Sequence, residues 1–88
     1  MSHDLQIPNA FRKVRRRKEL RLRNAIDRCV KLLAEDVHYP GLQVHRVQGT
    51  QGVWEAYVDI HNRVTFHWDG DVIVLRNNCN HDILDRNP

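Results

Sequence analysis

The sequence predicts an α+β domain in which an N-terminal helical hairpin packs on an antiparallel meander sheet of three or four strands. Residues 10–35 contain no Gly or Pro and are rich in Arg, Leu, Lys, Glu and Ala, a composition typical of helices. From residue 54 onward, apolar and polar residues alternate, as they do in half-buried strands. A chain of 88 residues suits one small domain, so we expect residues 1–88 to form a single unit.

The helical region is expected over residues 9–36, after a lead over residues 1–8. In the lead, Leu5 and Ile7 alternate with polar residues, so this segment is either an irregular lead or a short edge strand. Asn9 is the candidate N-cap, because its amide oxygen can accept a hydrogen bond from a free N–H group of the first helical turn.

The apolar residues of the helical region recur at three- and four-residue steps, which places them on one face of a helix. They are Leu22, Ala25, Ile26, Cys29, Val30 and Leu33. Basic residues over 15–18 interrupt a similar stripe, so the pattern fits two helices, roughly 9–17 and 19–35, or one bent helix. His-Tyr-Pro-Gly at 38–41 ends the region with a turn.

The β region is expected over residues 42–76, followed by a polar tail over residues 77–88. The predicted strands are residues 42–48, 54–60, 63–68 and 71–76. Asp69-Gly70 is a strong signal for a hairpin between the last two strands, because glycine tolerates the positive φ that tight hairpin turns need.

Alternation divides the two central strands into two faces. The apolar face should receive the helical stripe, and it comprises Trp54, Val58, Ile60, Val64, Phe66 and Trp68. The opposite face is expected to be open, and it comprises Glu55, Tyr57, Asp59, His61, Arg63, Thr65 and His67. His45 and His81, on flanking segments, can converge on this open face because neighbouring strands lie about 5 Å apart.

Histidine, arginine and aspartate on one face are the groups that RNA cleavage without a metal requires. A histidine exchanges a proton near neutral pH, so it can activate a ribose 2′-hydroxyl or protonate the leaving 5′-oxygen. An arginine binds the phosphate and stabilises the charge that develops on it. The open face therefore predicts a phosphodiester-cleaving site.

Each of these residues also has an ordinary structural interpretation. Arg63 can form a cross-strand ion pair, and the two tryptophans can fill the core instead of stacking on bases. A zinc site built on Cys79 and His81 is a further alternative, but no CxxC or HxxxH spacing supports it. The sequence contains no phosphate-binding Walker loop, serine-hydrolase elbow or dinucleotide-binding fingerprint.

Positive charge is concentrated near the N-terminus. Residues 1–36 carry ten Lys or Arg and five Asp or Glu, whereas residues 37–88 carry four and six. The basic cluster comprises Arg12, Lys13, Arg15, Arg16, Arg17, Lys18, Arg21 and Arg23. Such a run is typical of a solvated helix face, and it also suits a phosphate backbone or an acidic protein partner.

The composition argues against a secreted or membrane protein. No apolar run approaches the ~18 residues of a membrane span, and no charged segment followed by an apolar one marks a signal peptide. Two cysteines do not form a disulfide framework. We therefore expect a cytoplasmic protein without a membrane partner.

Several short segments, in their order and spacing, resemble the RelE/ParE superfamily of toxins from bacterial type II toxin–antitoxin systems. The resemblance covers about residues 9–84 and is strongest toward the YafQ-like branch of ribosome-dependent mRNA endonucleases. The matching segments are HRVQG at 45–49, GVW at 52–54, HNRVTF at 61–66, DGDVIVL at 69–75 and NHD at 80–82.

The resemblance implies a RelE-like fold and a set of catalytic residues. Arg63 would contact the scissile phosphate, and His81 would act as general acid or base, with His45 or His61 as its partner and Asp59 as an orienting group. The product would be a 2′,3′-cyclic phosphate, formed without a metal or another cofactor. RNA-binding residues would be Arg12, Lys13, Arg15, Arg16, Arg17, Lys18 and Arg46.

The resemblance also implies partners: mRNA, the ribosome with its RNA, and a cognate antitoxin whose acidic, partly disordered segment folds as it binds. Two other functions stay open. A ParE-like toxin would inhibit DNA gyrase without cutting RNA, and a non-catalytic relative would only bind RNA or protein. The histidines of the open face favour the endonuclease, because a toxin that only binds has no need of them.

Overall fold

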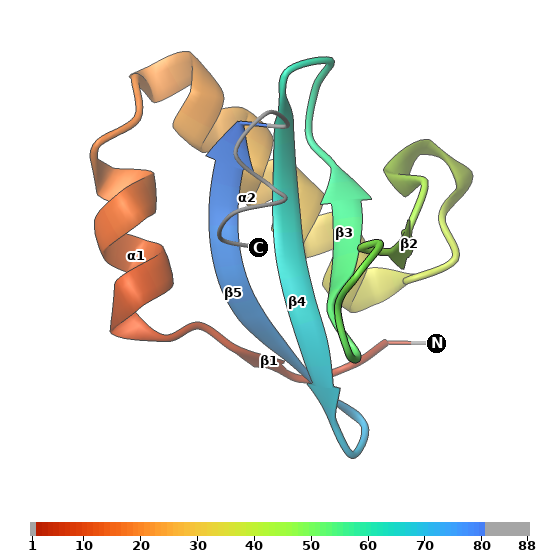
Figure 1. The fold of residues 1–88 in the computed structure, drawn as a ribbon. Helices are drawn as coiled ribbons and strands as arrows, with labels where there is room; N and C mark the ends of the chain where they lie inside the picture. The colour runs from red at the N-terminus through yellow and green to blue at the C-terminus, as the bar shows by residue number, and fades with distance from the viewer. Residues whose placement is uncertain (1, 81–88) are drawn as a thin grey trace.

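The structure is a computed structural model that describes residues 2–80. Its helices are α1 (Asn9–Arg16), α2 (Leu20–Glu35) and the short 3-10 helix η1 (Pro40–Leu42). Its strands are β1 (Leu5–Gln6), β2 (His45–Arg46), β3 (Trp54–Tyr57), β4 (Asn62–Asp69) and β5 (Val72–Asn80). They form one sheet in the order β1-β5-β4-β3-β2 (Figure 1), which confirms the α+β class.

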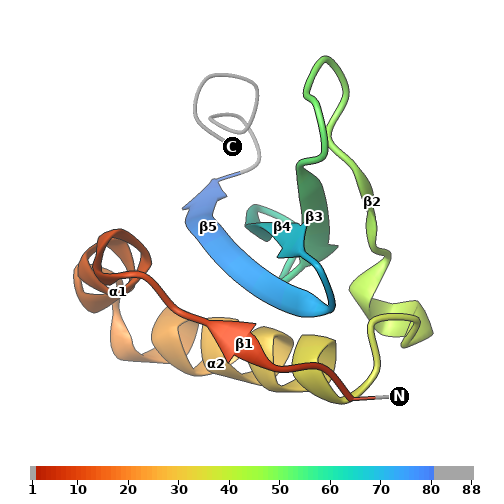
Figure 2. The same cartoon turned by 90° about the horizontal axis from the view of Figure 1, so that it is seen from below.

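Both helices lie on one side of a curved sheet (Figure 2). α2 runs along the convex face, and α1 flanks β5 at its edge. The concave face carries neither helix, so it is the part of the sheet where side chains can meet a partner. Within the described residues, no helix is long and apolar enough to cross a membrane.

The helical region is divided into two helices, as one of the two alternatives predicts. Residues 17–19 form the break between them. The prediction that Asn9 is the N-cap is wrong: Asn9 is already helical, and the cap is Pro8, whose extended backbone (φ −62°, ψ 155°) ends the preceding segment. Pro8 contributes no side-chain hydrogen bond to the first turn.

The lead forms a strand, and that strand makes the sheet mixed. β1 pairs with β5 in parallel, with Leu5 opposite Ile73, whereas all the other strand pairs are antiparallel. The strand predicted over 42–48 is reduced to two residues. Leu42 ends the 3-10 helix and Gln43 has a positive φ of 47°, so the chain becomes extended only beyond it.

The core lies between α2 and the convex face of the sheet. Ile26 and Leu33 of α2 meet Val64 and Phe66 of β4, and each of these is at most 1% exposed. The prediction that Ile60 joins this core is wrong, because β3 ends at Tyr57 and the following turn leaves Ile60 71% exposed.

One extra residue interrupts the pairing of β4 with β5. Thr65 pairs with Asn77 and Phe66 with Leu75, so Arg76 is left as a bulge. Beyond it the alternation of β5 is reversed, and residues 77–80, whose polar side chains predict the start of a polar tail, belong to the strand.

Two polar side chains stabilise the bulged segment. The backbone N–H of Asn77 donates to Thr65 Oγ1 at 3.1 Å, and Thr65 is fully buried. Asn78 points into the core, where its Nδ2 donates to the backbone oxygen of Phe11 at 3.1 Å and ties α1 to the sheet. The end of β5 is thus held in register from both faces.

We predict that Thr65→Val lowers the free energy of unfolding by about 1–3 kcal/mol, because the half-buried Asn77 N–H loses the acceptor that buried Thr65 provides. Urea denaturation followed by circular dichroism measures the change. Thr50→Val is the control: Thr50 Oγ1 donates to Val47 at 2.6 Å in a partly exposed loop, where water can replace it. An equal loss in both variants would show that the bulge has no special dependence on Thr65.

Candidate functional site

Two rows of side chains cross the concave face. The strand register defines them as His45–Glu55–Thr65 and Tyr57–Arg63–Cys79. Residues directly opposite on antiparallel strands share a face, so the rows lie side by side across β3 and β4. The expectation that this face is fully open is wrong at Glu55 and Thr65, which are 4% and 0% exposed.

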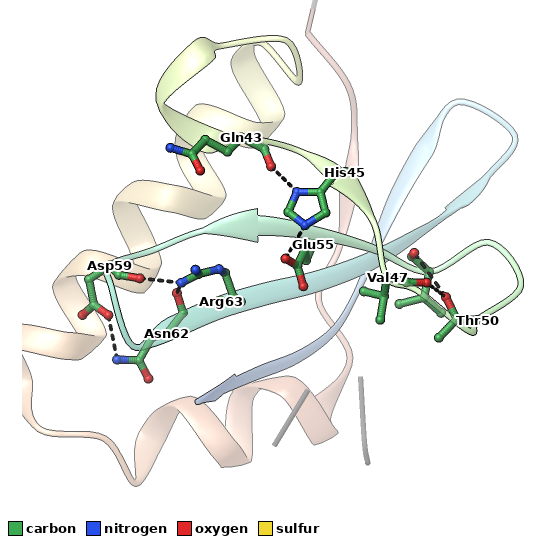
Figure 3. Close-up of polar contacts among 9 residues, drawn as sticks. Gln43, His45, Val47, Thr50, Glu55, Asp59, Asn62 and Arg63 are labelled. Atoms are coloured by element: carbon green, nitrogen blue, oxygen red, sulfur yellow. Dashed lines mark hydrogen bonds and ion pairs between the residues drawn. The ribbon is translucent and has the colours of Figure 1, made fainter. Parts of the chain in front are cut away.

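His45 and Glu55 form an ion pair at the edge of the site (Figure 3). His45 Nε2 lies 2.5 Å from Glu55 Oε1, and His45 Nδ1 lies 2.7 Å from the backbone oxygen of Gln43. Both ring nitrogens thus face oxygen acceptors, an arrangement that the protonated imidazolium satisfies completely. The His45 side chain is 59% exposed while that of Glu55 is 5% exposed, so the histidine covers a buried carboxylate.

Arg63 lies beside this pair on the same face (Figure 3). Its Nη1 donates to the backbone oxygens of Asp59 at 2.6 Å and Asn62 at 2.9 Å, and its guanidinium lies 4.8 Å from the centre of the Tyr57 ring. Within residues 2–80, Nε and Nη2 donate to no protein acceptor. Arg63 is therefore held in one orientation by one nitrogen and keeps donors for an anion.

Asp59 organises the turn from which Arg63 is held. Its Oδ1 accepts hydrogen bonds from the backbone N–H of His61 and from Asn62 Nδ2, both at 2.9 Å. Burial alone would raise the pKa of the Asp59 carboxyl, but these bonds outweigh burial and hold its pKa below the ordinary value. Asp59 thus orients the backbone of His61, and His61 itself is exposed in this turn.

Cys79 lies opposite Arg63 and is not an activated thiol. Burial, the largest effect, raises its pKa, and the charge of Glu55 adds to the rise while that of Lys18 opposes it. Burial also raises the pKa of Cys29, in the core, to about 12. Neither cysteine is therefore suited to nucleophilic chemistry. The positive charge of Lys18 also acts on the Cys79 thiol of the concave face.

The predicted RNA-binding residues of α1 fall into two groups. Arg15 is bound to Asp27 of α2 through two contacts of 2.6 Å, and this pair raises the pKa of Arg15 and lowers that of Asp27. Arg12 donates to the backbone oxygen of Ile7 at 3.2 Å. Lys13, Arg16 and Arg17 are exposed and form no such contact within residues 2–80, and half-buried Lys18 follows them in the chain. Arg15 thus forms an interhelical ion pair, which leaves it less available to bind a phosphate.

The remaining predicted site residues lie elsewhere. Arg46 pairs with Trp54, which puts it on the face opposite to Arg63. His81 lies outside the described residues. Residues 2–80 contain no group of three or more His, Cys, Asp or Glu placed to hold a metal ion.

Sequence reasoning placed Glu55 and Tyr57 on this face but assigned them no part in the site. The signal was present in the pattern: each stands opposite a predicted site residue, Glu55 opposite His45 and Tyr57 opposite Arg63. Their contribution depends on burial and ring contact, which alternation does not report. Lys18 was assigned to the helical RNA surface, and its proximity to Cys79 follows only from the way α1 packs on β5.

No protein-family model matches the sequence, and no curated protein sequence matches it. Solved structures do. The Escherichia coli DinJ–YafQ toxin–antitoxin complex matches with a TM-score of 0.69 at 17% identity, over 96% of this chain and 98% of that chain. The archaeal RelE–RelB complex from Pyrococcus horikoshii matches with 0.70 at 15% identity, over 91% and 96%.

A YoeB/ParE toxin from Agrobacterium tumefaciens matches with a TM-score of 0.72 at 12% identity, over 89% of this chain and 98% of that chain. In each comparison the match spans nearly the whole length of this chain and of the chain it is compared with. The chain therefore has the fold that RelE, YafQ and YoeB/ParE toxins share, as its sequence resemblance implies.

The lowered pKa of Asp59 generates a prediction about pH. The stabilisation from its ionised form is complete above the ordinary value of 3.8 and is lost as the pH falls through the lower value of the folded state. The stability difference between wild type and Asp59→Asn should therefore be largest at neutral pH and shrink below pH 3.8. Urea denaturation from pH 7 to pH 2 measures it, with Asp69→Asn as the exposed-acid control. A difference that stays constant over this range would contradict the role given to the turn carboxylate.

Proposed function

We propose that this chain is the toxin of a type II toxin–antitoxin pair and that it cuts mRNA on the ribosome without a metal. The observation that carries the proposal is Arg63, which is fixed on a helix-free sheet face with donors to spare, beside the His45–Glu55 pair. The RelE-like fold supports the same conclusion, since the neighbours are toxins.

Arg63 binds the scissile phosphate in this proposal. An in-line attack by the ribose 2′-hydroxyl places additional negative charge on the phosphate oxygens. Arg63 Nε and Nη2, which donate to no acceptor within residues 2–80, can contact these oxygens together. The Tyr57 ring beneath the guanidinium and the backbone oxygens of Asp59 and Asn62 hold the group in place before the substrate arrives. This fixed orientation lowers the cost of ordering the arginine during the reaction.

His45 supplies one of the two proton transfers. The 2′-hydroxyl gives its proton to a base, its oxygen bonds to phosphorus, and the bond to the 5′-oxygen breaks to leave a 2′,3′-cyclic phosphate and a 5′-hydroxyl. The exposed His45 ring can transfer a proton to the leaving oxygen when the contact of Nδ1 with the Gln43 backbone oxygen opens, while buried Glu55 holds Nε2 and orients the ring. His81 remains the proposed second group, and Asp59 and His61 support the turn that positions Arg63.

The exposed basic residues of α1 bind ribosomal RNA. Lys13, Arg16 and Arg17 contact phosphates through charge and counterion release, without reading sequence. Lys18, half-buried in the break between the helices, continues this basic surface along the chain. Arg12, Arg15 and Arg46 contribute less, because the first two have intramolecular partners and Arg46 is on the other side of the sheet.

The partner that silences this activity is an antitoxin. The DinJ–YafQ and RelE–RelB structures are complexes of that kind. For this chain, an acidic segment that folds onto the concave face and the basic surface of α1 would neutralise both at once. The pair would act in the cytoplasm, where ribosomes translate.

We predict that Arg63→Gln reduces the rate of mRNA cleavage about 10²–10³-fold, the effect of removing one preorganised charge stabiliser from an active site. Induced expression with growth curves, and primer extension on an abundant transcript, measure toxicity and cleavage. Arg28→Gln, in α2, is the matched control with the same change in charge. Urea denaturation of both variants separates loss of chemistry from loss of folding.

The same experiment distinguishes the competing functions. Cuts within translated codons that disappear in Arg63→Gln support the endonuclease. Growth arrest with intact mRNA would instead indicate a toxin that binds a protein such as gyrase, and no arrest would leave a relative that binds without toxicity. Either result would reject the proposed chemistry.

We predict that Arg16→Gln weakens binding to ribosomes more than Arg15→Gln does, although both remove one positive charge from α1. Arg15 is already neutralised by Asp27, whereas Arg16 is exposed. The slope of log affinity against log salt should fall by about 0.7–0.9 for Arg16→Gln, the contribution of one phosphate contact. Co-sedimentation with ribosomes over a salt series measures this slope. Equal changes in both variants would mean that the total charge of α1, and not its exposed face, determines binding.

A further inference from the structure

A groove separate from the concave face lies where β4 turns into β5. Its volume is about 640 Å³, within the range of sites that bind small ligands or peptide side chains. Three segments that are distant in the sequence form its walls: the N-terminal segment, the loop around η1 and the β4–β5 turn. We call it the aromatic groove, and the lining residues that matter here are His3, Tyr39, Trp54, Trp68 and Asp71.

Three aromatic rings give the groove its chemistry. Trp68 is held by edge-to-face contacts with His3 at 4.9 Å and Phe66 at 5.9 Å between ring centres. Trp54 and Trp68 are only half-buried, and Tyr39 is 42% exposed. Exposed aromatic rings gathered at a concave surface bind cations through their π faces and apolar groups through their area.

Acidic residues lie in or next to the segments that line the groove. Asp71 lines the groove, and Asp4, Asp36 and Asp69 each adjoin a lining residue in the sequence. Within residues 2–80, none of these four carboxylates forms an ion pair. α2 ends at Glu35 without a basic residue in its last turn, so the negative end of its dipole adds to the field near Val37.

Arg46, opposite Trp54 in the register, offsets part of this charge. The groove's described lining residues include one acid, Asp71, and no Lys or Arg, in contrast to the exposed basic face of α1. Polyanions are therefore excluded from the aromatic groove by the same electrostatics that attract them to α1. Its surface is complementary to a positive charge carried between apolar groups.

We propose that the aromatic groove binds an extended segment of a protein partner in which arginine or lysine is flanked by apolar side chains. The cation lies against the indole rings and within reach of Asp71, and the flanking side chains cover Pro40 and Val44. This site is independent of RNA cleavage, because it shares no residue with the rows around Arg63.

Tryptophan fluorescence reports this site directly, because the chain has two tryptophans and both line the groove. The probe is an acetylated and amidated pentapeptide with a central arginine, a leucine on each side and glycine at both ends. The matched peptide carries citrulline, the uncharged isostere of arginine. We expect a saturable change in emission with the arginine peptide, and binding weaker by roughly fivefold with the citrulline peptide, the scale of one cation–π contact.

Two variants of the full chain test where the peptide binds. Asp71→Asn should weaken binding of the arginine peptide about threefold, by removing one nearby charge. Glu19→Gln, which removes an exposed charge from the start of α2, should leave it unchanged. Equal binding of the two peptides, equal losses in the two variants, or no saturable signal would overturn the proposal. Argininamide that binds as tightly as the peptide would also overturn it, because the site would then take a small cation and not a peptide segment.

Discussion

The extra residue in β5 at Arg76 is the constraint on which both faces of the sheet depend. Before it, Ile73 points into the core; after it, the alternation is reversed, so that Asn78 enters the core and Cys79 joins Arg63 on the concave face. A bulge also increases the twist and bend of its strand, and Figure 2 shows how β5 curves around the concave side. One inserted residue therefore determines both the shape of this face and the side chains that occupy it.

A buried carboxylate gives this face its electrostatic character. Removing Glu55 from water is costly unless a positive group compensates it, and His45 provides that compensation at the surface. Arg63 lies in the next row, and Lys18 acts on the same region from the end of α1. The positive groups thus surround a fixed negative centre, which holds them in place and limits how far the face as a whole favours anions.

Local patterns were sufficient to predict much of this architecture. The period of α2, the alternation of β4 and the turn at Gly70 each lie within a few residues; alternation put Arg63 on the concave face, and strand spacing predicted that His45 converges on it. The pairing of Leu5 with β5 could not be predicted, because the lead over residues 1–8 contains no information about a partner as distant in the sequence as Ile73. The burial of Glu55 likewise depends on packing across strands and not on its own sequence neighbours.

The parallel pairing of β1 with β5 also sets the order in which the molecule can be completed during synthesis. Leu5 is made 68 residues before its partner Ile73, so the first strand must wait while the helices and the meander form. Until then the exposed edge of β5 does not exist and the N-terminal segment has no place to dock. A nascent chain therefore lacks the finished sheet until β5 has been synthesised and can pair with β1.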